Sequence, residues 1–244
     1  PSSPPPQGGW PAVMVVPAFV GVVINPGYLA QLGYATLTLY PRGQGESKHE
    51  WQLDGDTGTI HYKMAKNVTD PEKFYYSAAY LDCIRGLDFL DSRSEVDSSR
   101  MAVTGSSQGG GLTFAMAALD KRTKVAIARL PSLCNLPLAV EMKAEGCAEL
   151  HDYLEQHPEE RDAAMKTLSY IDNLNLADAI TAHTLVSFAQ VDSNHPYDTV
   201  MPVFEKIPAI KSVVIYPEAT NNVHSGAINT DFNQHMVEWL KRYL

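Results

Sequence analysis

Short apolar runs alternate along this chain with longer amphipathic stretches, which predicts strands separated by helices. Uninterrupted apolar runs bounded by polar or turn residues are typical of strands that are buried on both faces. Such runs lie at residues 12–16, 34–40, 101–104, 125–130, 185–190 and 212–216. Alternating strands and helices imply crossover connections, so we expect an α/β fold with a mostly parallel sheet covered by helices on both faces.

Helical signals fill the intervals between these runs. Asp70 and Pro71 are suited to open a long helix, with Asp70 as its cap. Its apolar face is expected to consist of Ala78, Leu81, Ile84, Leu87 and Leu90. Further helices are predicted at 28–32, ending at Gly33, at 112–119 and at 232–244, and a helical excursion of several short helices at about 136–174.

The composition fits one globular domain. The chain has 244 residues, of which 45% are hydrophobic, so we expect a single domain over 10–244 after a Pro-rich linker or N-terminal segment at 1–9. The formal net charge is −9 without a block of basic residues, which argues against nucleic acid as a partner. No apolar stretch is long enough to cross a bilayer, so no membrane partner is expected.

Three cysteines, Cys83, Cys134 and Cys147, give an odd number without close spacing. This pattern disfavours a disulfide framework or a zinc site and favours reduced thiols in a cytoplasmic protein. The histidines show no metal-ligand spacing, and there is no glycine-rich nucleotide motif. Neither a metal nor another cofactor is therefore expected.

The most informative motif is Gly105-Ser106-Ser107-Gln108-Gly109, which has the form G-x-S-x-G between a predicted strand and a predicted helix. This context is that of a nucleophile elbow, in which the serine occupies a strained turn and small neighbours avoid clashes. We therefore predict Ser107 as the nucleophile. Ser106 is a competing serine, but it occupies the wrong position of the motif.

A nucleophilic serine needs a base and a third group that holds the base. In the α/β-hydrolase fold these follow in the order Ser, acid, His. Asp192 comes after the strand at 185–190, and His224 follows the last strand, so both fit this order. Asp198, expected at a helix start, and His195, which precedes the last strand, are rivals. His235 falls inside the final helix and fits a non-catalytic role better.

With these residues and several further motifs, the chain resembles carbohydrate esterase family 7, which includes acetyl xylan esterases and cephalosporin C deacetylases. The family pattern of R-G-Q, G-x-S-Q-G and H-E is similar to Arg42-Gly43-Gln44, to the motif around Ser107, and to His224-Ser225. Further likeness is carried by Asp70-Pro71 with Phe74-Tyr75-Tyr76, by Thr167-Leu168-Ser169-Tyr170 with Asp172, and by Asp192 with Pro196 and Thr199.

The resemblance implies deacetylation of small acetylated sugars and related esters by an intracellular, hexameric enzyme. It also implies that the backbone N–H groups of Gln108 and Phe19 hold the oxyanion. Arg42 is expected to brace loops rather than to act on substrate, and the aromatic cluster Phe74-Tyr75-Tyr76 to pack a helix rather than to line a sugar site. Two departures are Ser225, where the family has Glu, and Pro17-Ala18-Phe19, where it has His-Gly-Tyr.

Two alternatives stay open. One is a serine hydrolase that acts on another short-chain ester, a lactone or a short peptide. The other, suggested by the two departures, is a catalytically weak relative that binds acylated ligands.

Overall fold

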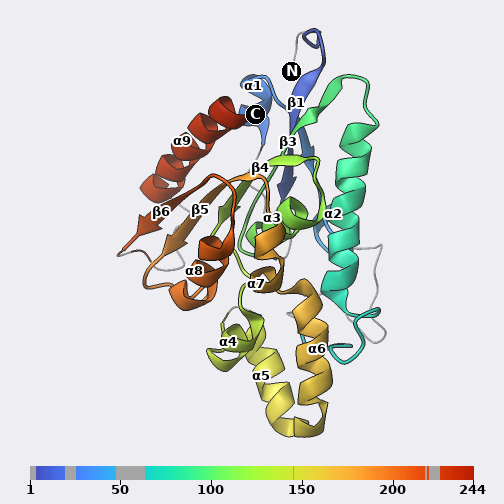
Figure 1. Cartoon of the computed structure of the whole chain (residues 1–244), viewed down its shortest axis with the longest axis vertical. Helices are drawn as coiled ribbons and strands as arrows, with labels where there is room; N and C mark the ends of the chain where they lie inside the picture. The colour runs from blue at the N-terminus through green and yellow to red at the C-terminus, as the bar shows by residue number, and fades with distance from the viewer. Residues whose placement is uncertain (1–3, 20–25, 48–63, 145, 218, 220–225) are drawn as a thin grey trace.

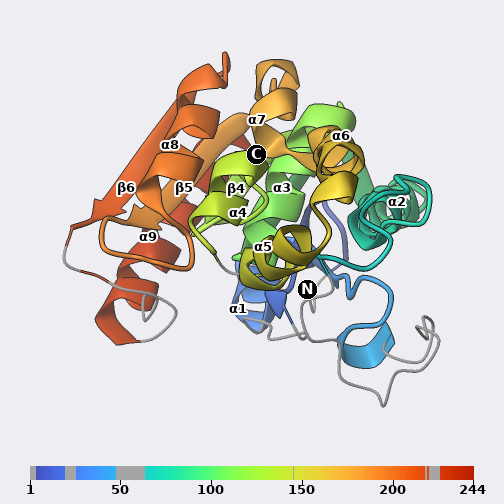
Figure 2. The same ribbon diagram turned by 90° about the horizontal axis from the view of Figure 1, so that it is seen from below.

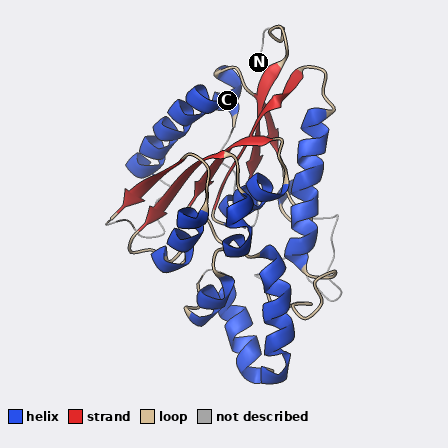
Figure 3. Cartoon of the chain, viewed as in Figure 1, coloured by secondary structure: helices blue, strands red, loops and turns tan. Residues whose placement is uncertain are grey.

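The structure is a computed structural model that describes residues 4–19, 26–47, 64–144, 146–217, 219 and 226–244. In these residues a single twisted sheet separates two layers of helices (Figures 1 and 3). Every predicted apolar run forms a strand. The strands are β1 (Trp10–Val16), β2 (Ala35–Thr38), β3 (Val96–Ser106), β4 (Thr123–Arg129), β5 (His183–Ala189) and β6 (Lys211–Tyr216).

The sheet has the order β2-β1-β3-β4-β5-β6, and all its neighbouring strands are parallel. Parallel pairing brings the carboxyl ends of the strands to one edge. The register of the central strands pairs Val16 with Gly105 and Ser106 with Arg129. The turn after β3 is therefore flanked by the ends of β1 and β4, at the edge where ligands bind in open α/β sheets.

Helices cover both faces of the sheet, as predicted (Figure 2). Leu29, Phe232 and Met236 pack on one face from α1 (Gly27–Gln31) and α9 (Gly226–Tyr243). The opposite face is covered by α2 (Tyr75–Asp91), α3 (Gln108–Leu119) and α8 (Tyr197–Lys206).

The predicted helical excursion is confirmed and extends beyond the sheet layer at the lower end of Figure 1. It consists of α4 (Leu136–Glu141), α5 (Cys147–Gln156), a 3-10 turn (Pro158–Glu160), α6 (Arg161–Ile171) and α7 (Asn173–Leu176). Further 3-10 turns span Gly45–Ser47 and Ala177–Ala179. All three cysteines are buried, and none of them is part of a disulfide in the described structure. In the described part of the chain, no helix combines the length and the apolarity that a membrane span requires.

The prediction for the long helix was wrong in two respects. The helix begins at Tyr75 rather than Pro71, because Asp70 closes a separate turn: its carboxylate accepts from the Glu72 N–H at 3.1 Å, and Phe74 is extended. The buried face also differs, since Leu81 is 59% exposed. Tyrosines and a cysteine, which the apolar pattern left out, make up much of that face together with Leu87 and Leu90.

Candidate active site

The backbone at Ser107 has the strained geometry expected of a nucleophile elbow. β3 ends at Ser106, α3 begins at Gln108, and Ser107 lies between them with φ 53° and ψ −118°. A non-glycine residue in such a conformation costs roughly 1–3 kcal/mol and persists only where the surrounding structure enforces it. Here the Ser107 N–H donates to the Arg129 carbonyl at 2.9 Å, and the Ser107 carbonyl accepts from Ser132 N–H at 3.0 Å.

Gly105 and Gly109 are needed because neighbouring backbone leaves no space for a side chain. A Cβ on Gly105 would lie 2.5 Å from the Gly109 carbonyl and 2.6 Å from the Val16 carbonyl oxygen. A Cβ on Gly109 would also collide with the Val16 carbonyl oxygen. The expectation that small residues flank Ser107 is therefore confirmed: they let the turn fit against the end of β1.

The N-terminus of α3 presents a backbone donor next to Ser107. In the described part of the chain, no acceptor takes up the Gln108 backbone N–H. Such a donor at a helix N-terminus favours developing negative charge. Phe19, the other predicted oxyanion donor, is buried and lines the same small cavity as Gln108. The two residues predicted to hold the oxyanion thus lie at one cavity.

Arg42, as expected, braces a loop. Its guanidinium forms a bidentate pair with Asp82, with Nε–Oδ2 at 2.9 Å and Nη2–Oδ1 at 2.6 Å. Its backbone N–H donates to the same carboxylate at 3.0 Å. Gly43 adopts φ 75°, a left-handed conformation that glycine tolerates. The loop that carries Gln44 is therefore fixed to α2.

Gln44 links this loop to Gln108, the residue after Ser107. The Gln44 and Gln108 side-chain amides pair reciprocally, at 2.9 Å and 3.0 Å, and both residues are buried. Gln44 Nε2 also donates to the Tyr75 hydroxyl at 2.8 Å, and the Tyr76 hydroxyl donates to Gln108 Oε1 at 3.3 Å. The aromatic cluster thus packs α2, as expected, and Tyr76 also lines the small cavity.

We expect Gln44→Ala to lower the free energy of unfolding by about 2–4 kcal/mol, because it leaves the buried side-chain amide of Gln108 without its reciprocal pair and removes a donor to the Tyr75 hydroxyl. Urea denaturation measures this change. Gln31→Ala, at an exposed position of α1, should change it by less than about 0.5 kcal/mol. Additive effects of Gln44→Ala and Gln108→Ala in the double variant would contradict the pairing.

Sequence reasoning missed Ser132. Its hydroxyl lies 3.4 Å from that of Ser107, in the loop after β4. Three non-glycine residues of this loop, Leu130, Leu133 and Asn135, have positive φ. The loop is held by Asp172, which accepts from the Leu136 N–H at 2.7 Å, and by Asn173, which donates to the Leu133 carbonyl at 2.9 Å. The signal was available: the loop follows the strand next to β3, so it has to pass the elbow.

Asp192 lies after β5, as predicted, with a buried carboxylate whose oxygens are both engaged. Oδ1 accepts from the backbone N–H groups of Asn194 at 2.8 Å and His195 at 3.1 Å. Oδ2 lies 3.0 Å from His195 Nδ1. Burial acts to raise the pKa of Asp192, but the His195 ring and the two N–H donors outweigh it and hold that pKa below its usual range. The carboxylate is therefore ionised at neutral pH.

Of the rival residues, only His195 has a described contact with Asp192. His195 precedes the last strand and was therefore disfavoured as the base. Among the described residues, it is the histidine that contacts Asp192. Asp198 is exposed in the first turn of α8, as expected. His235 lies in α9, also as expected, with its side chain 45% exposed and 3.7 Å from Asp231. The predicted base, His224, and its neighbour Ser225 lie outside the described residues.

In the described ranges, one group of side chains has ligand atoms close enough together to bind a metal ion. His157, Glu159 and Glu160 place one ligand atom each within 4.8 Å of one another, in the turn between α5 and α6. The site around Ser107 uses none of them.

Comparison with known proteins matches residues 23–243 to the model of the acetyl xylan esterase (AXE1) family. The acetyl esterase Axe7A of Xylanibacter ruminicola is 25% identical over 99% of this chain and 55% of its own length. The chain thus spans about half the length of that curated relative.

Two solved structures are also similar. The acetyl xylan esterase from Paenibacillus sp. R4 has a TM-score of 0.86 and 34% identity, covering 100% of this chain and 77% of that one. Acetyl xylan esterase 1 from Thermoanaerobacterium sp. JW/SL YS485 has a TM-score of 0.82 and 24% identity, with the same coverage, and supports the α/β-hydrolase fold. With a family model that matches nearly the whole chain, the protein belongs to the acetyl xylan esterase family.

Proposed function

We propose that this protein is a serine carboxylesterase that removes acetyl groups from small acetylated carbohydrates such as xylo-oligosaccharides, and from related esters such as cephalosporin C. The observation that carries the proposal is the strained Ser107 backbone at the start of α3, beside a small cavity. Membership of the acetyl xylan esterase family supports the same assignment.

In the proposed reaction, Ser107 attacks the ester carbonyl while His224 takes the hydroxyl proton. Asp192 orients His224 and stabilises its imidazolium form. The Gln108 and Phe19 N–H groups bind the oxyanion, and each such donor is typically worth about 3–4 kcal/mol. His224 returns the proton to the leaving alcohol, which leaves an acetyl-enzyme. Water then attacks the acetyl group with His224 as base, which releases acetate and restores Ser107.

The small cavity supports a preference for acetyl groups. It has a volume of about 20 Å³ and includes Phe19, Gln108 and Ser132, the groups nearest the reacting carbonyl, in its lining. Met64, Tyr76 and Leu136 close its apolar side. Each extra methylene of the acyl group would have to displace these side chains. The test is therefore a chain-length series of 4-nitrophenyl acetate, butyrate and octanoate, together with acetylated xylo-oligosaccharides and a matching anilide.

A steep fall in kcat/KM beyond acetate, with release of acetate from the oligosaccharides, is the expected result. A faster reaction with the anilide than with the ester would move the assignment to a peptidase. Equal rates with acetate and octanoate would contradict the tight acyl pocket.

We expect Leu136→Val to raise the ratio of kcat/KM for butyrate over acetate by roughly tenfold, because it makes space for one of the two methylenes that butyrate adds. The side chain is buried in α4 at the cavity. Leu87→Val removes the same volume from the same core cluster but away from the cavity, so the ratio should stay unchanged. A similar shift in both variants would mean that the cavity does not receive the acyl group.

The binding-only alternative, suggested by the two departures from the family pattern, is supported by one structural observation: the Asp192 carboxylate already has a histidine partner, His195. A fluorophosphonate probe distinguishes the two functions. Labelling of the wild type, lost in Ser107→Ala, supports an activated serine, whereas an unlabelled wild type supports a protein that only binds acylated ligands.

Assembly into a hexamer is proposed from the family resemblance, with neither cofactor, nucleic acid nor membrane required by the reaction. Sedimentation velocity measures the assembly. A single species at six times the chain mass of 26.8 kDa is expected, and a monomer at all concentrations would contradict it.

A further inference from the structure

Arg129 is a buried cation beside the nucleophile turn. It is the last residue of β4, pairs in register with Ser106, and is only 4% exposed. Its Nη1 donates to Asn229 Oδ1 and its Nη2 to Asn233 Oδ1, the latter at 2.6 Å. The guanidinium also stacks over the Phe232 ring, 4.5 Å from the ring centroid. Three residues of α9 therefore fix the position of this charge.

None of these contacts neutralises the charge of Arg129. Both acceptors are uncharged amides, and among the described residues no carboxylate lies within ion-pair distance of this guanidinium. By contrast, Arg42 and Arg122 each hold a carboxylate. Burial lowers the pKa of Arg129 to about 10, which leaves it charged at neutral pH. Among the residues that the structure describes, this buried charge has no counterion, which is costly, so the site favours an anion.

In the described ranges, the titratable groups that act on the charge of Arg129 are two tyrosines, Tyr28 of α1 and Tyr216 at the end of β6. The pKa of each is raised, above all by burial, so both are neutral hydroxyls near pH 7. The Tyr216 hydroxyl donates to Asp231 at 2.8 Å. Neither tyrosine therefore supplies the missing negative charge.

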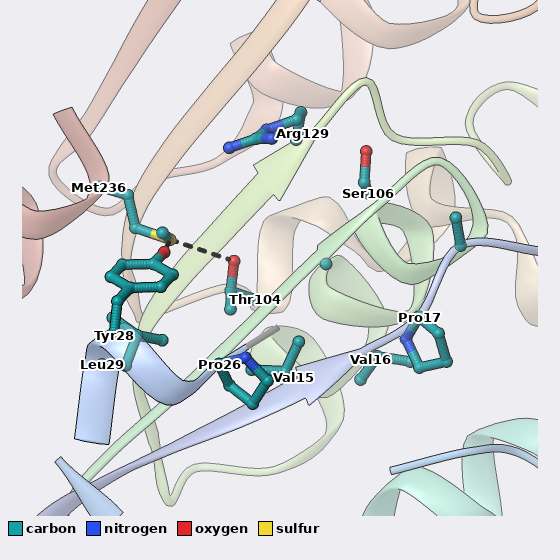
Figure 4. Close-up of a pocket in the computed structure, with 12 residues that line it drawn as sticks. Val15, Val16, Pro17, Pro26, Tyr28, Leu29, Thr104, Ser106, Arg129 and Met236 are labelled. Atoms are coloured by element: carbon teal, nitrogen blue, oxygen red, sulfur yellow. Dashed lines mark hydrogen bonds between the residues drawn. The ribbon is translucent and has the colours of Figure 1, made fainter. Parts of the chain in front are cut away.

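A cavity of about 40 Å³ lies next to the guanidinium (Figure 4). By the usual measure, this holds roughly three water-sized groups. Its polar lining consists of Arg129, the hydroxyls of Thr104 and Ser106, and Tyr28, whereas Val15 and Pro26 belong to its apolar lining. The cavity thus has room for a small anion with one charged end and one apolar end, but not for a sugar.

We propose that this cavity binds a small monocarboxylate such as acetate, with its carboxylate on Arg129 and its methyl group against the apolar lining. The cavity borders the elbow: Pro17 and Ala18 precede Phe19, and Ser106 precedes Ser107. If the proposed function holds, acetate is the acid product, and the site would keep it beside the catalytic turn. Anion binding itself does not depend on the esterase activity.

The test is isothermal titration calorimetry with sodium acetate at constant ionic strength, with no ester present. The wild type is expected to bind one acetate at this site, and acetamide, which has the same shape without the charge, should bind at least tenfold more weakly. Glucuronate, a carboxylate on a sugar, should not bind, because the cavity is too small. Equal affinity for acetate and acetamide would overturn the proposal.

Two variants locate the site. Arg129→Gln removes the charge, and Asn233→Asp supplies an internal carboxylate to the same guanidinium, so each should weaken acetate binding at least tenfold. Asn233→Asp should also raise the melting temperature, which keeps the test valid if Arg129→Gln folds poorly. Gln234→Glu makes the same charge change at an exposed neighbouring position and should leave acetate affinity unchanged. Unchanged affinity in Asn233→Asp would place acetate elsewhere and overturn the proposal.

A failure here is distinguishable from a failure of the proposed function. If the protein is an active esterase but Asn233→Asp does not weaken acetate binding, the proposed Arg129 site is wrong and the esterase assignment stands. Conversely, if the protein is inactive but its acetate binding depends on Arg129, the site is supported and the esterase assignment is wrong.

Discussion

Replacing Ser107 by Ala is expected to lower kcat for 4-nitrophenyl acetate by about four to six orders of magnitude, the range seen when a serine hydrolase loses its nucleophile. The physical reason is that the acetyl-enzyme cannot form, and only water held near the oxyanion donors remains to attack. The substitution removes one hydroxyl and keeps the Cβ in its strained backbone position, so the fold should persist. Steady-state kinetics and a melting curve measure both.

Ser106→Ala is the matched control for this experiment. Ser106 is the adjacent serine, equally part of the motif, but it closes β3 and lines the Arg129 cavity rather than the small cavity around Gln108. We expect its kcat to stay within about fivefold of the wild type, since most substitutions away from the reacting atoms cost little. A reversal, with Ser106→Ala inactive and Ser107→Ala active, would show that Ser106, and not Ser107, is the nucleophile.

The strands and the elbow were predictable because each rests on local sequence. A strand of a parallel sheet is a short apolar run even at the sheet edges, where β2 and β6 are only partly buried, so all six runs were found. The G-x-S-x-G motif is also a local signal. Its glycines are needed because backbone of the neighbouring strand β1 lies beside the turn and leaves no space for a Cβ. Local patterns therefore determined the fold class and the position of Ser107.

Side-chain partners were not predictable in the same way. Gln44 and Gln108 are 64 positions apart, and their reciprocal amide pair depends on how a loop folds against α3. The place of the Ser132 loop, after the strand next to β3, could be foreseen, but not the 3.4 Å distance between the two hydroxyls, because the loop includes two leucines with positive φ, Leu130 and Leu133. The face of α2 was misjudged because Tyr76, Tyr80 and Cys83 are buried by tertiary packing. Such contacts follow from the assembled fold rather than from local pattern.

The second large effect concerns the two histidines that compete for Asp192. We expect His224→Ala to lower kcat by about five to six orders of magnitude, as loss of a general base does in a serine hydrolase. For His195→Ala we expect a loss of roughly tenfold to a hundredfold, the value of one hydrogen bond to a charged group. The order along the chain favours His224 as base, whereas His195 Nδ1 lies 3.0 Å from Asp192 Oδ2. Kinetics of both variants decide between them.

A positioning role of His195 has its own signature in the pH profile. An ionised carboxylate only accepts, so His195 Nδ1 carries the hydrogen and helps to lower the pKa of Asp192. Without this donor, the pKa of Asp192 rises, and its carboxylate becomes a stronger acceptor for the proton of His224, whose pKa rises in turn. Both changes shift the acidic limb of kcat/KM to higher pH.

His195→Asn separates this role from a purely structural one, because the Asn amide can place an N–H close to the former Nδ1. We expect it to recover most of the activity lost in His195→Ala and to return the acidic limb toward its wild-type position. If instead His195→Ala and His195→Asn are both as inactive as a nucleophile variant while His224→Ala keeps most of its activity, then His195 is the base. The reaction would then run through the pair that lies buried after β5, and the order Ser, acid, His would not hold in this chain.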